Sequence, residues 1–423
     1  MSRNRFVRAE RIGADVEALA AITDPERPWT RRAFTPRFLE GRAYIEAAMR
    51  AAGLEPRLDA AGNLIGRRRG RRPGGGAIVV GSHSDTVPDG GRFDGIAGVA
   101  AGLEIARALA ERDVALDHDL EVIDCLAEEV SIFGVSCVGS RAIAGTLPAD
   151  WLQRAAAGKT LAEGIAEVGG DPRRLAEAKR DDIRAFLELH IEQGPVLEAE
   201  RIDLGIVTAI CGVTRVEIEV EGRADHAGTT PMDRRADALL SAARLVDAIN
   251  HSARGRAAEA ARRGYFAATV GEFRIEPNAA NVVPSRARLL VDARAERRSE
   301  MEDFLAELER LLAGQNGCAE TRATLRVVSD NPPTPSDPAL LDEIEAAADI
   351  VGVSHRRMAS GAGHDMAWFA RVAPAAMVFA PCRGGRSHAP EEWAETDAIA
   401  LGAETLLETV LRLDRRGPDA ASL

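Results

Sequence analysis

Between about residues 35 and 210, short apolar segments alternate with segments of helical periodicity. Segments 77–80 and 120–126 are rich in aliphatic and β-branched residues and are followed by glycine or by acids, as buried strands often are. Segments 36–52 and 98–112 carry apolar residues at helical spacing. Strands separated by helices of this length predict an α/β layer with a mostly parallel sheet, in which functional side chains collect where the strands end.

The pattern changes near residue 212. Segment 214–220 alternates between polar and apolar residues, as a strand with one solvent-exposed face does. The elements that follow have the order β-α-β-β-α-β, which is that of a ferredoxin-like module. The expected strands are 214–220, 266–275, 287–293 and 321–328, and the expected helices are 236–250 and 299–313, with Ser299 as N-cap of the second. The Pro-rich segment 331–335 is expected to be a linker.

We therefore predict a discontinuous α/β domain that carries an inserted ferredoxin-like α+β module. Residues 1–211 and 331–423 would form the first domain, and residues 212–330 the module. The length of 423 residues agrees with more than one hydrophobic core.

Composition and charge exclude several classes of protein. No apolar run approaches the roughly 20 residues that span a bilayer. The formal net charge of −12 disfavours nucleic acid and anionic membranes as partners. The five cysteines lack CxxC spacing, and the N-terminal residues lack an apolar signal core. We therefore expect a cytoplasmic protein without a disulfide framework or a Cys-rich zinc site.

Two further features are expected to be structural. The basic run 67–72 is expected to be a solvated hairpin between two strands, with an anion-binding patch as the alternative. His118, His251 and His355 lie among charged residues and are expected to be solvated.

His83 follows the 77–80 strand, at a place where an imidazole can face a cleft. Asp85, two residues later, lies on the same side of an extended backbone and could hold the second ring nitrogen of His83. The glycine-rich loop 89–95 allows Asp94 to point back to the same place. Taken alone, this segment could also be a β-turn with a capping aspartate.

Glu128 and Glu129 end the next strand. Adjacent acids cannot share one face of a strand, so one can bind metal while the other accepts a proton; acids that open a loop are the alternative. His190 ends a third strand, and His388 lies near the C-terminus. Imidazole and carboxylate ligands without thiolate suit zinc, manganese or cobalt in a hydrolytic site. Such a set exceeds the needs of a single catalytic zinc and would serve two ions that share a carboxylate.

In four blocks the chain resembles the amidase branch of the di-metal aminoacylase/carboxypeptidase superfamily. That branch contains N-carbamoyl-L-amino-acid hydrolase, β-ureidopropionase, allantoate amidohydrolase and ureidoglycolate amidohydrolase. The resemblance runs from Phe34 to about Leu413. Its blocks are GSHSDTVPDGGRFDG at 81–95, LELHIEQGPVLE at 187–198, GRADHAGTTPMDRRADAL at 222–239 and SGAGHDMAWFA at 360–370.

The resemblance implies two divalent metal ions per subunit, with Zn²⁺ as the first expectation and Mn²⁺, Co²⁺ or Ni²⁺ as alternatives. It implies Glu128 as the general base and Asp94 as the bridging ligand. The implied metal ligands are His83, Asp94, Glu129, His190 and His388.

The resemblance also implies residues that bind the substrate. Gln193 and Gly361 match pocket positions of the catalytic domain, and Arg215, Asn281 and Arg294 match substrate-binding positions of the inserted module. His226 matches a histidine that acts in the neighbouring subunit's active site, so a homodimer is implied.

Two departures from the family pattern concern the substrate. Residues 130–132 are Val-Ser-Ile where carbamoylases usually have glycine and then arginine, and FGVSCVGS at 133–140 is closer to ureidoglycolate-type members. Near the last ligand, Arg386 and Ala389 replace a more usual apolar residue and an asparagine.

The implied activity is hydrolysis of a linear ureido C–N bond in a small carboxylated substrate, first of all an N-carbamoyl-L-amino acid. Allantoate and ureidoglycolate are the alternatives. An N-acyl-amino-acid hydrolase or metallopeptidase, and a binding protein without catalytic activity, are the rival interpretations.

Overall fold

The computed structural model describes residues 6–260, 264–318 and 320–415, and they divide into two compact units. The first unit contains the chain up to Thr208, Ser336–Arg357, and the residues from His364 onward. The second contains Ala209–Pro335 and the short segment Met358–Gly363. The sequence interpretation placed this short segment in the first domain. It belongs to the second unit because Cys211 N–H donates to the carbonyl of Ser360 at 2.9 Å.

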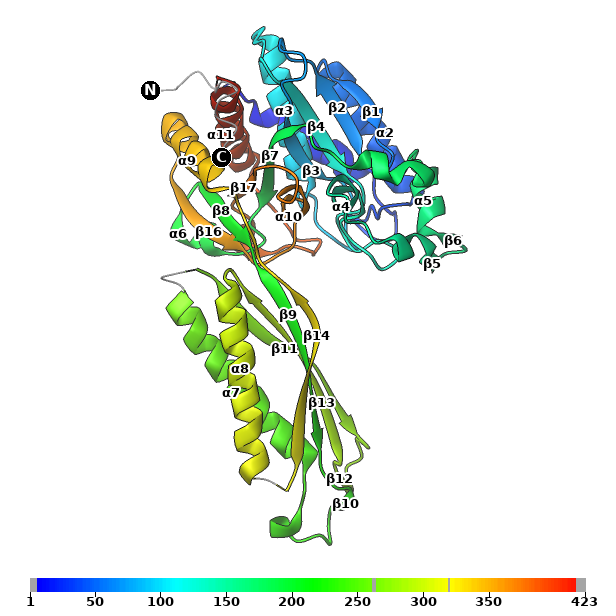
Figure 1. Ribbon diagram of the computed structural model, residues 1–423, viewed down its shortest axis with the longest axis vertical. Helices are drawn as coiled ribbons and strands as arrows, with labels where there is room; N and C mark the ends of the chain where they lie inside the picture. The colour runs from blue at the N-terminus through cyan, green and yellow to red at the C-terminus, as the bar shows by residue number, and fades with distance from the viewer. Residues whose placement is uncertain (1–5, 261–263, 319, 416–423) are drawn as a thin grey trace. The chain divides into compact units, whose positions relative to one another are not determined.

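A central sheet organises the first unit (Figure 1). Its strands lie in the order β1-β2-β4-β3-β7-β17-β8, and the neighbours β4, β3, β7 and β17 run parallel. The predicted α/β fold with a mostly parallel sheet is therefore confirmed. The bounds are β1 Glu55–Leu58, β2 Leu64–Arg68, β3 Ala77–His83, β4 Asp119–Cys125, β7 Ile183–Ile191, β8 Leu204–Ile210 and β17 Ala375–Ala380.

Helices cover this sheet and create its core. On β7, Leu187 and Leu189 belong to the main apolar cluster, which α1, α3, α9 and α11 share. The alternate residue Phe186 stacks on Phe369 of α10, with ring centroids 3.7 Å apart. This period of two sends His190 to the same side as Phe186. The helices are α1 Ala9–Ala21, α2 Pro36–Ala51, α3 Ile96–Glu111, α4 Val138–Ile143, α5 Leu161–Glu167, α6 Val196–Glu200, α9 Pro338–Val351, α10 Met366–Phe369 and α11 Thr396–Arg415.

The second unit is an antiparallel sheet with strand order β11-β13-β9-β14 and helices α7 and α8 on one face (Figure 1). The predicted ferredoxin-like order is thus observed. Val216, Ile218 and Val220 point into its core, whereas Arg215 and the acids between these residues point out. The bounds are β9 Gly212–Glu221, α7 Ala238–Ala260, β11 Phe266–Glu276, β13 Arg286–Ala295, α8 Arg298–Cys318 and β14 Arg322–Asn331.

Two local predictions in the second unit were wrong. α8 begins at Arg298, so Ser299 lies inside its first turn and is not the N-cap. The Pro-rich segment is not a free linker, because β14 continues to Asn331 and β15 (Thr334–Pro335) pairs with Ala209 and Ile210. Pro335, which has no N–H group, is tolerated because β15 is the last strand in the sheet order of the described residues, where no further strand needs a donor.

His118 was also predicted wrongly. It is buried, and its Nδ1 lies 3.0 Å from Asp414 Oδ1 of α11, because the end of that helix packs over the start of β4. The basic run is not a hairpin, since β2 and β3 both pair with β4 and not with each other. Its arginines are neutralised locally: Arg67 pairs with Asp119, and Arg71 lies 2.7 Å from Asp117.

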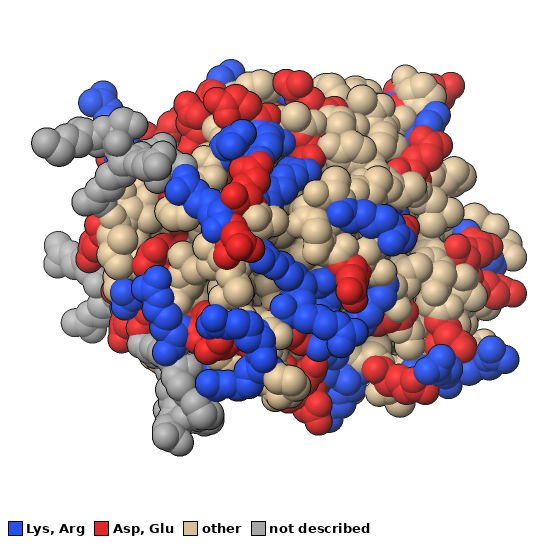
Figure 2. Space-filling model, turned by 90° about the horizontal axis from the view of Figure 1, so that it is seen from above, with Lys and Arg blue, Asp and Glu red and all other residues tan. Residues whose placement is uncertain are grey.

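Charged side chains of both signs are interspersed on the face shown in Figure 2, in agreement with this local pairing. Among the described residues, every helix is too short or too polar to cross a lipid bilayer.

Candidate metal centre

The ends of neighbouring strands place the predicted histidines and acids together. β4, β3 and β7 are parallel neighbours, so their carboxyl ends lie at one edge of the sheet. His83 is the last residue of β3, His190 is the next-to-last of β7, and Glu128 and Glu129 follow soon after β4. These side chains are buried. The strand order therefore places histidine and glutamate side chains, which are common metal ligands, at one edge of the sheet.

The Asp94 carboxylate lies between two groups of these side chains. Its Oδ1 atom is 3.5 Å from His83 Nε2 and 3.3 Å from His190 Nε2. Its Oδ2 atom is 3.3 Å from His388 Nε2, which is 3.0 Å from Glu129 Oε1. We call the position among His83, Asp94 and His190 the inner position, and that among Asp94, Glu129 and His388 the outer position. The structure thus brings together every residue that the resemblance implied as a metal ligand.

These separations fit a pair of divalent ions. With metal–ligand bonds of about 2.0–2.2 Å, neighbouring ligand atoms of a tetrahedral site lie about 3.3–3.6 Å apart. The contacts of Asp94 with the histidines span 3.3–3.5 Å. The donors are imidazole nitrogens and carboxylate oxygens, which suit zinc and manganese. One carboxylate with an oxygen aimed at each group is the arrangement that a bridging ligand requires.

Backbone carbonyls fix the orientation of the buried histidines. His83 Nδ1 lies 3.0 Å from the carbonyl of Asp85, and His190 Nδ1 lies 2.9 Å from that of Ile191. A carbonyl can only accept, so each Nδ1 carries the proton and each Nε2 keeps its lone pair. Gly95 N–H donates to His190 Nε2 at 3.1 Å, which agrees with this tautomer. The Nε2 atoms of the two rings both lie near Asp94 Oδ1.

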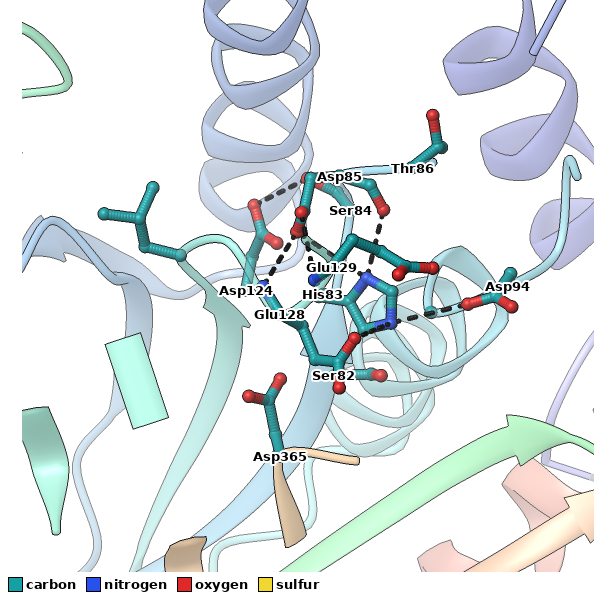
Figure 3. Close-up of polar contacts among 12 residues, drawn as sticks. Ser82, His83, Ser84, Asp85, Thr86, Asp94, Asp124, Glu128, Glu129 and Asp365 are labelled. Carbon is teal, nitrogen blue, oxygen red and sulfur yellow. Dashed lines mark hydrogen bonds and ion pairs between the residues drawn. The ribbon is translucent and has the colours of Figure 1, made fainter. Parts of the chain in front are cut away.

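Asp85 connects His83 to the paired glutamates. The sequence predicts that its side chain holds the His83 ring, but the carboxylate Oδ1 is 3.6 Å from Nδ1 and the backbone carbonyl makes the contact instead. The carboxylate accepts the backbone N–H groups of Glu128 at 3.2 Å and Glu129 at 3.3 Å (Figure 3). Burial raises the pKa of Asp85 to about 7. Asp85 thus fixes the backbone from which both glutamates project.

The backbone around the centre is held in uncommon conformations. Ala127, Gln193 and His388 have φ values of 52°, 58° and 52°, in the left-handed region that non-glycine residues rarely adopt. Such residues tend to cluster at functional sites, because the surrounding structure must stabilise them. Gly95 has φ of 66°, and a side-chain carbon there would lie 2.4 Å from the His83 ring. The turn that follows Asp94 therefore requires glycine.

Glu128 lies beside the ligands and not among them. Its Oε2 is 3.6 Å from His83 Nε2, and its Oε1 is 3.5 Å from the Cys137 Sγ atom. Burial disfavours the ionised form and, with the nearby charge of Glu129, raises the pKa of Glu128 well above its ordinary value. Its carbonyl also accepts the Cys137 N–H at 3.0 Å. A buried acid with a raised pKa next to a metal site is suited to proton transfer.

The two positions differ in exposure. The side chains of His83 and His190 are 1% exposed, whereas that of His388 is 48% exposed. Hydrogen bonds to Asp94 and Glu129 raise the pKa of His388 to about 10. Burial would raise the pKa of Asp94, but the neighbouring histidines hold it well below its ordinary value. Protons and metal ions therefore compete for these groups.

Gln193 lies at the outer position. Its Nε2 donates to Asp94 Oδ2 at 2.6 Å, and its Oε1 is buried without a hydrogen-bond partner among the described residues. An amide oxygen in that state is available to a donor on a bound molecule.

Sequence reasoning did not find Ser387, Glu392 or a role for His364. Ser387 Oγ is 3.0 Å from Asp94 Oδ2, and Glu392 accepts the Asp94 N–H at 3.1 Å. The His364 ring packs edge-on against His190, with centroids 4.5 Å apart. The available signal was proximity along the chain, since Ser387 and Glu392 flank His388 and His364 lies in the block at 360–370.

In the second unit, His226 and Asn281 lie together. His226 is on β10 (Asp225–His226), which pairs with β12 (Val282–Val283), and Ala227 N–H donates to the Asn281 carbonyl at 3.0 Å. His226 is exposed, and its Nδ1 accepts the N–H groups of Gly228 and Thr229 at 3.0 and 3.2 Å. Its Nε2 therefore carries the proton and can donate.

Arg215, Arg294 and Gly361 form a separate group at the start of β9. Both arginines pair with Asp292: Arg215 Nε is 3.1 Å from Oδ2, and Arg294 Nε is 2.8 Å from Oδ1. Arg294 also donates to the Gly361 carbonyl at 2.6 Å. Arg215 lies near the start of β9, whereas His226 lies beyond its end. The predicted residues of this unit thus form two groups at opposite ends of the strand.

Known proteins share both the sequence and the fold of this chain. The model of the peptidase family M20/M25/M40 matches residues 79–412. An N-carbamoyl-L-amino-acid amidohydrolase of Paenarthrobacter aurescens is 38% identical over 96% of this chain and 98% of its own length. A ureidoglycolate hydrolase of rice (Oryza sativa subsp. japonica) is 34% identical over 96% of this chain and 85% of its own length.

A solved structure has the same fold. It is an amidase of the hydantoinase/carbamoylase family from Burkholderia multivorans, with 36% identity, a TM-score of 0.87 and coverage of 97% of this chain and 98% of its own. The family model includes every residue of the inner and outer positions. The chain therefore belongs to the peptidase family M20/M25/M40.

Proposed function

We propose that this protein is a metal-dependent amidohydrolase that cleaves a linear ureido C–N bond in a small carboxylated substrate, first of all an N-carbamoyl-L-amino acid. The observation that carries the proposal is the Asp94 carboxylate between two histidine groups, with the buried acid Glu128 beside it. The names of the similar proteins support a ureido substrate.

His83, Asp94 and His190 would hold one divalent ion, and Asp94, Glu129 and His388 the other, with Zn²⁺ as the first expectation. Bound there, such ions polarise the substrate carbonyl and lower the pKa of a water molecule to roughly 7.

Glu128 is the proposed general base. It would take the proton of the attacking water and later deliver it to the leaving amine, and a carboxyl group whose pKa is raised holds that proton more readily than an ordinary glutamate does. Its raised pKa, its burial and its backbone bonds to Asp85 and Cys137 all suit that role. Catalysis of this kind typically contributes about 10²–10⁴-fold in rate.

Arg294 is proposed to bind the substrate carboxylate. A guanidinium group matches the geometry of a carboxylate, and Asp292 and the Gly361 carbonyl hold this one in place. Arg215 shares Asp292 and would support the same end of the substrate.

His226 is proposed to act in the active site of a partner subunit, in a homodimer. Its protonated Nε2 can donate to the oxygen that becomes negative during the reaction, and one such donor is typically worth about 3–4 kcal/mol. Within the second unit His226 and Asn281 lie at the opposite end of β9 from Arg294. That separation is the reason to expect that His226 and Arg294 of one chain serve different active sites.

Ureidoglycolate is the second candidate substrate, and one observation favours it. The segment 133–140, which is closer to ureidoglycolate-type members, supplies Cys137, and the Cys137 thiol contacts Glu128 Oε1. The amino-acid sequence of this segment can therefore affect the proposed base through the contact between Cys137 and Glu128.

Hydrolysis of a substrate panel tests the proposal, with ammonia release measured for the ureido compounds and release of free amino acid measured for the dipeptides and N-acetyl amino acids. The panel contains N-carbamoyl-L-amino acids, β-ureidopropionate, allantoate, ureidoglycolate, dipeptides and N-acetyl amino acids. We expect turnover of a ureido acid, loss of that turnover after chelation, and recovery when Zn²⁺, Mn²⁺ or Co²⁺ is returned. Turnover of dipeptides or N-acetyl amino acids alone would reject the substrate class, and full activity in protein shown to be metal-free would reject the metal centre.

A further inference from the structure

Glu392 is a buried carboxylate that touches the segments on both sides of the outer position. Its side chain is fully buried, although it follows the half-exposed His388 by only four residues. Oε1 accepts the backbone N–H groups of Phe93 at 2.8 Å and Asp94 at 3.1 Å. Oε2 accepts the hydroxyl of Ser387 at 2.6 Å. One carboxylate therefore joins the loop of Asp94 to the loop of His388.

The surrounding chain is shaped to admit this carboxylate. A side-chain carbon at Gly91 would lie 1.8 Å from Glu392 Oε1, so the glycine-rich loop can wrap around the carboxylate only without a side chain there. Ser387 extends the link to the ligand itself, because its Oγ lies 3.0 Å from Asp94 Oδ2. Glu392 thus holds the backbone of Asp94, and Ser387 Oγ lies between the Glu392 and Asp94 carboxylates.

We propose that Glu392 is a positioning residue that sets the separation between Asp94 and His388, and with it the metal affinity of the outer position. The inference rests on the proposed function in one respect, that divalent ions bind at these positions. The inner position shares Asp94 but should depend less on Glu392, because carbonyls of Asp85 and Ile191 orient its other two ligands, His83 and His190.

The expected size of the effect follows from the contacts. Removing the carboxylate leaves two buried N–H groups without an acceptor, and the loops must shift to solvate them. Loss of a group that orients metal ligands typically weakens metal binding about 10–100-fold.

The test is a metal titration of Glu392→Ala against a competing chelator, with Zn²⁺ for affinity and Co²⁺ for the visible absorption of each position. We expect the binding step that the Co²⁺ spectrum assigns to the outer position to weaken at least tenfold, the other step to change less, and the Co²⁺ spectrum of the outer position to change. Hydrogen exchange of the metal-free protein gives a readout that involves no ion: amides in segment 90–96 should exchange faster in the variant.

A second variant covers the case in which Glu392→Ala does not fold. Glu392→Gln keeps one oxygen for the backbone N–H groups but reverses the contact with Ser387, because its amide N–H group must donate to Ser387 Oγ where the carboxylate accepted. We expect the metal affinity of the outer position to fall selectively in this variant too, but by a smaller factor. The proposal would be overturned if this variant had the wild-type metal affinity at each of the two steps and wild-type hydrogen exchange in segment 90–96.

Two controls separate positioning from general stability. Glu391→Ala removes the neighbouring carboxylate, which is exposed and pairs with Arg386 at 3.0 Å. Glu104→Ala removes another fully buried carboxylate, which lies away from the metal centre. This carboxylate accepts the Arg8 N–H at 2.9 Å. Both controls should keep wild-type affinity at both steps, although Glu104→Ala should lower the melting temperature. Equal weakening of both steps in Glu104→Ala and Glu392→Ala would assign a purely structural role to Glu392.

The wild-type titration distinguishes this inference from the proposed function. If the wild type binds no divalent ions, the proposed function fails. If it binds two and Glu392→Ala binds them equally well, only the inference fails.

Discussion

The two units present their predicted functional residues in opposite ways. In the first, the side chains that face Asp94 come from separate strand ends and from the loop of His388, are mostly buried, and converge within a few ångströms. In the second, Arg215 and Arg294 lie on an open sheet face, and His226 lies exposed on a small two-stranded sheet beyond the far end of β9. The residues around Asp94 all lie together within one chain, whereas the predicted residues of the second unit form two separated groups.

This difference reflects how each set is held. The carboxyl ends of neighbouring parallel strands lie at one edge of the sheet, so the main core fixes the proposed metal ligands. The residues of the second unit are fixed only locally, by Asp292 for the arginines and by backbone N–H groups for His226. A residue held in this manner can serve whichever active site its unit faces, including one in a second copy.

The largest effect should come from the buried set. Glu128→Gln keeps a hydrogen-bonding side chain but cannot accept a proton, so turnover should fall by about 10²–10⁴-fold. Metal content should stay at the wild-type value. Steady-state kinetics and elemental analysis on the same sample measure both quantities.

Glu129→Gln is the matched control for this experiment. It should lose metal from the outer position, because Glu129 faces His388 at 3.0 Å. If both variants lost metal equally, or if Glu128→Gln kept its turnover, the roles assigned to the two glutamates would be wrong.

The open face of the second unit should give the next largest effect. Arg294→Ala should lower kcat/KM by the factor that corresponds to a loss of about 2–5 kcal/mol of transition-state binding, as is typical when one partner of a charged pair is removed. Arg288→Ala is the control, because Arg288 points out from the same strand and pairs with Glu217 at 3.6 Å. An uncharged carbamoyl amide that is cleaved as well as the corresponding acid would remove Arg294 from the substrate site.

The proposed exchange of His226 between subunits predicts complementation. Glu128→Ala and His226→Ala should each be inactive, but in a mixed dimer one site would combine an intact Glu128 with an intact His226 from the other chain. With random exchange about half of the dimers are mixed, so roughly a quarter of all sites should recover. If subunits are shown to exchange and no activity returns, His226 does not act across a dimer.

The smallest effect concerns pH and stability in the metal-free protein. The pKa of His388 is about 10 in the folded chain, above the ordinary value of roughly 6.5. The charged pairs of His388 therefore stabilise the fold fully below about pH 6.5, and this stabilisation is lost as pH rises toward 10. Asp85, with a pKa of about 7, lowers stability over a different range, from about pH 4 to 7, because there its folded form retains a proton that the unfolded chain releases.

Thermal melts across this range provide the measurement. The melting temperature of the metal-free protein should fall as pH rises from about 6.5 to 10, and that of the zinc-loaded protein should fall less, because the ion replaces the proton on His388. Parallel curves for the two forms would show that His388 does not bind the ion.

The sequence alone was sufficient where local pattern and topology act together. The apolar runs at 77–80 and 120–126 predicted the neighbouring parallel strands whose ends carry His83 and the paired glutamates. It was insufficient where a contact joins distant segments. Nothing near His118 indicates that Asp414, 296 residues later, will cover it, and nothing near Asp94 indicates that Glu392 will accept its N–H group.

The double use of Asp292 has a consequence for the charge of the substrate. Two guanidinium groups share one carboxylate, so Arg215, Arg294 and Asp292 together retain a single positive charge. A substrate with one carboxylate neutralises that charge, whereas one with two carboxylates exceeds it. N-carbamoyl derivatives of alanine and of aspartate are thus expected to compete unequally, with the monoanion preferred, and Asp292→Asn should move the preference toward the dianion.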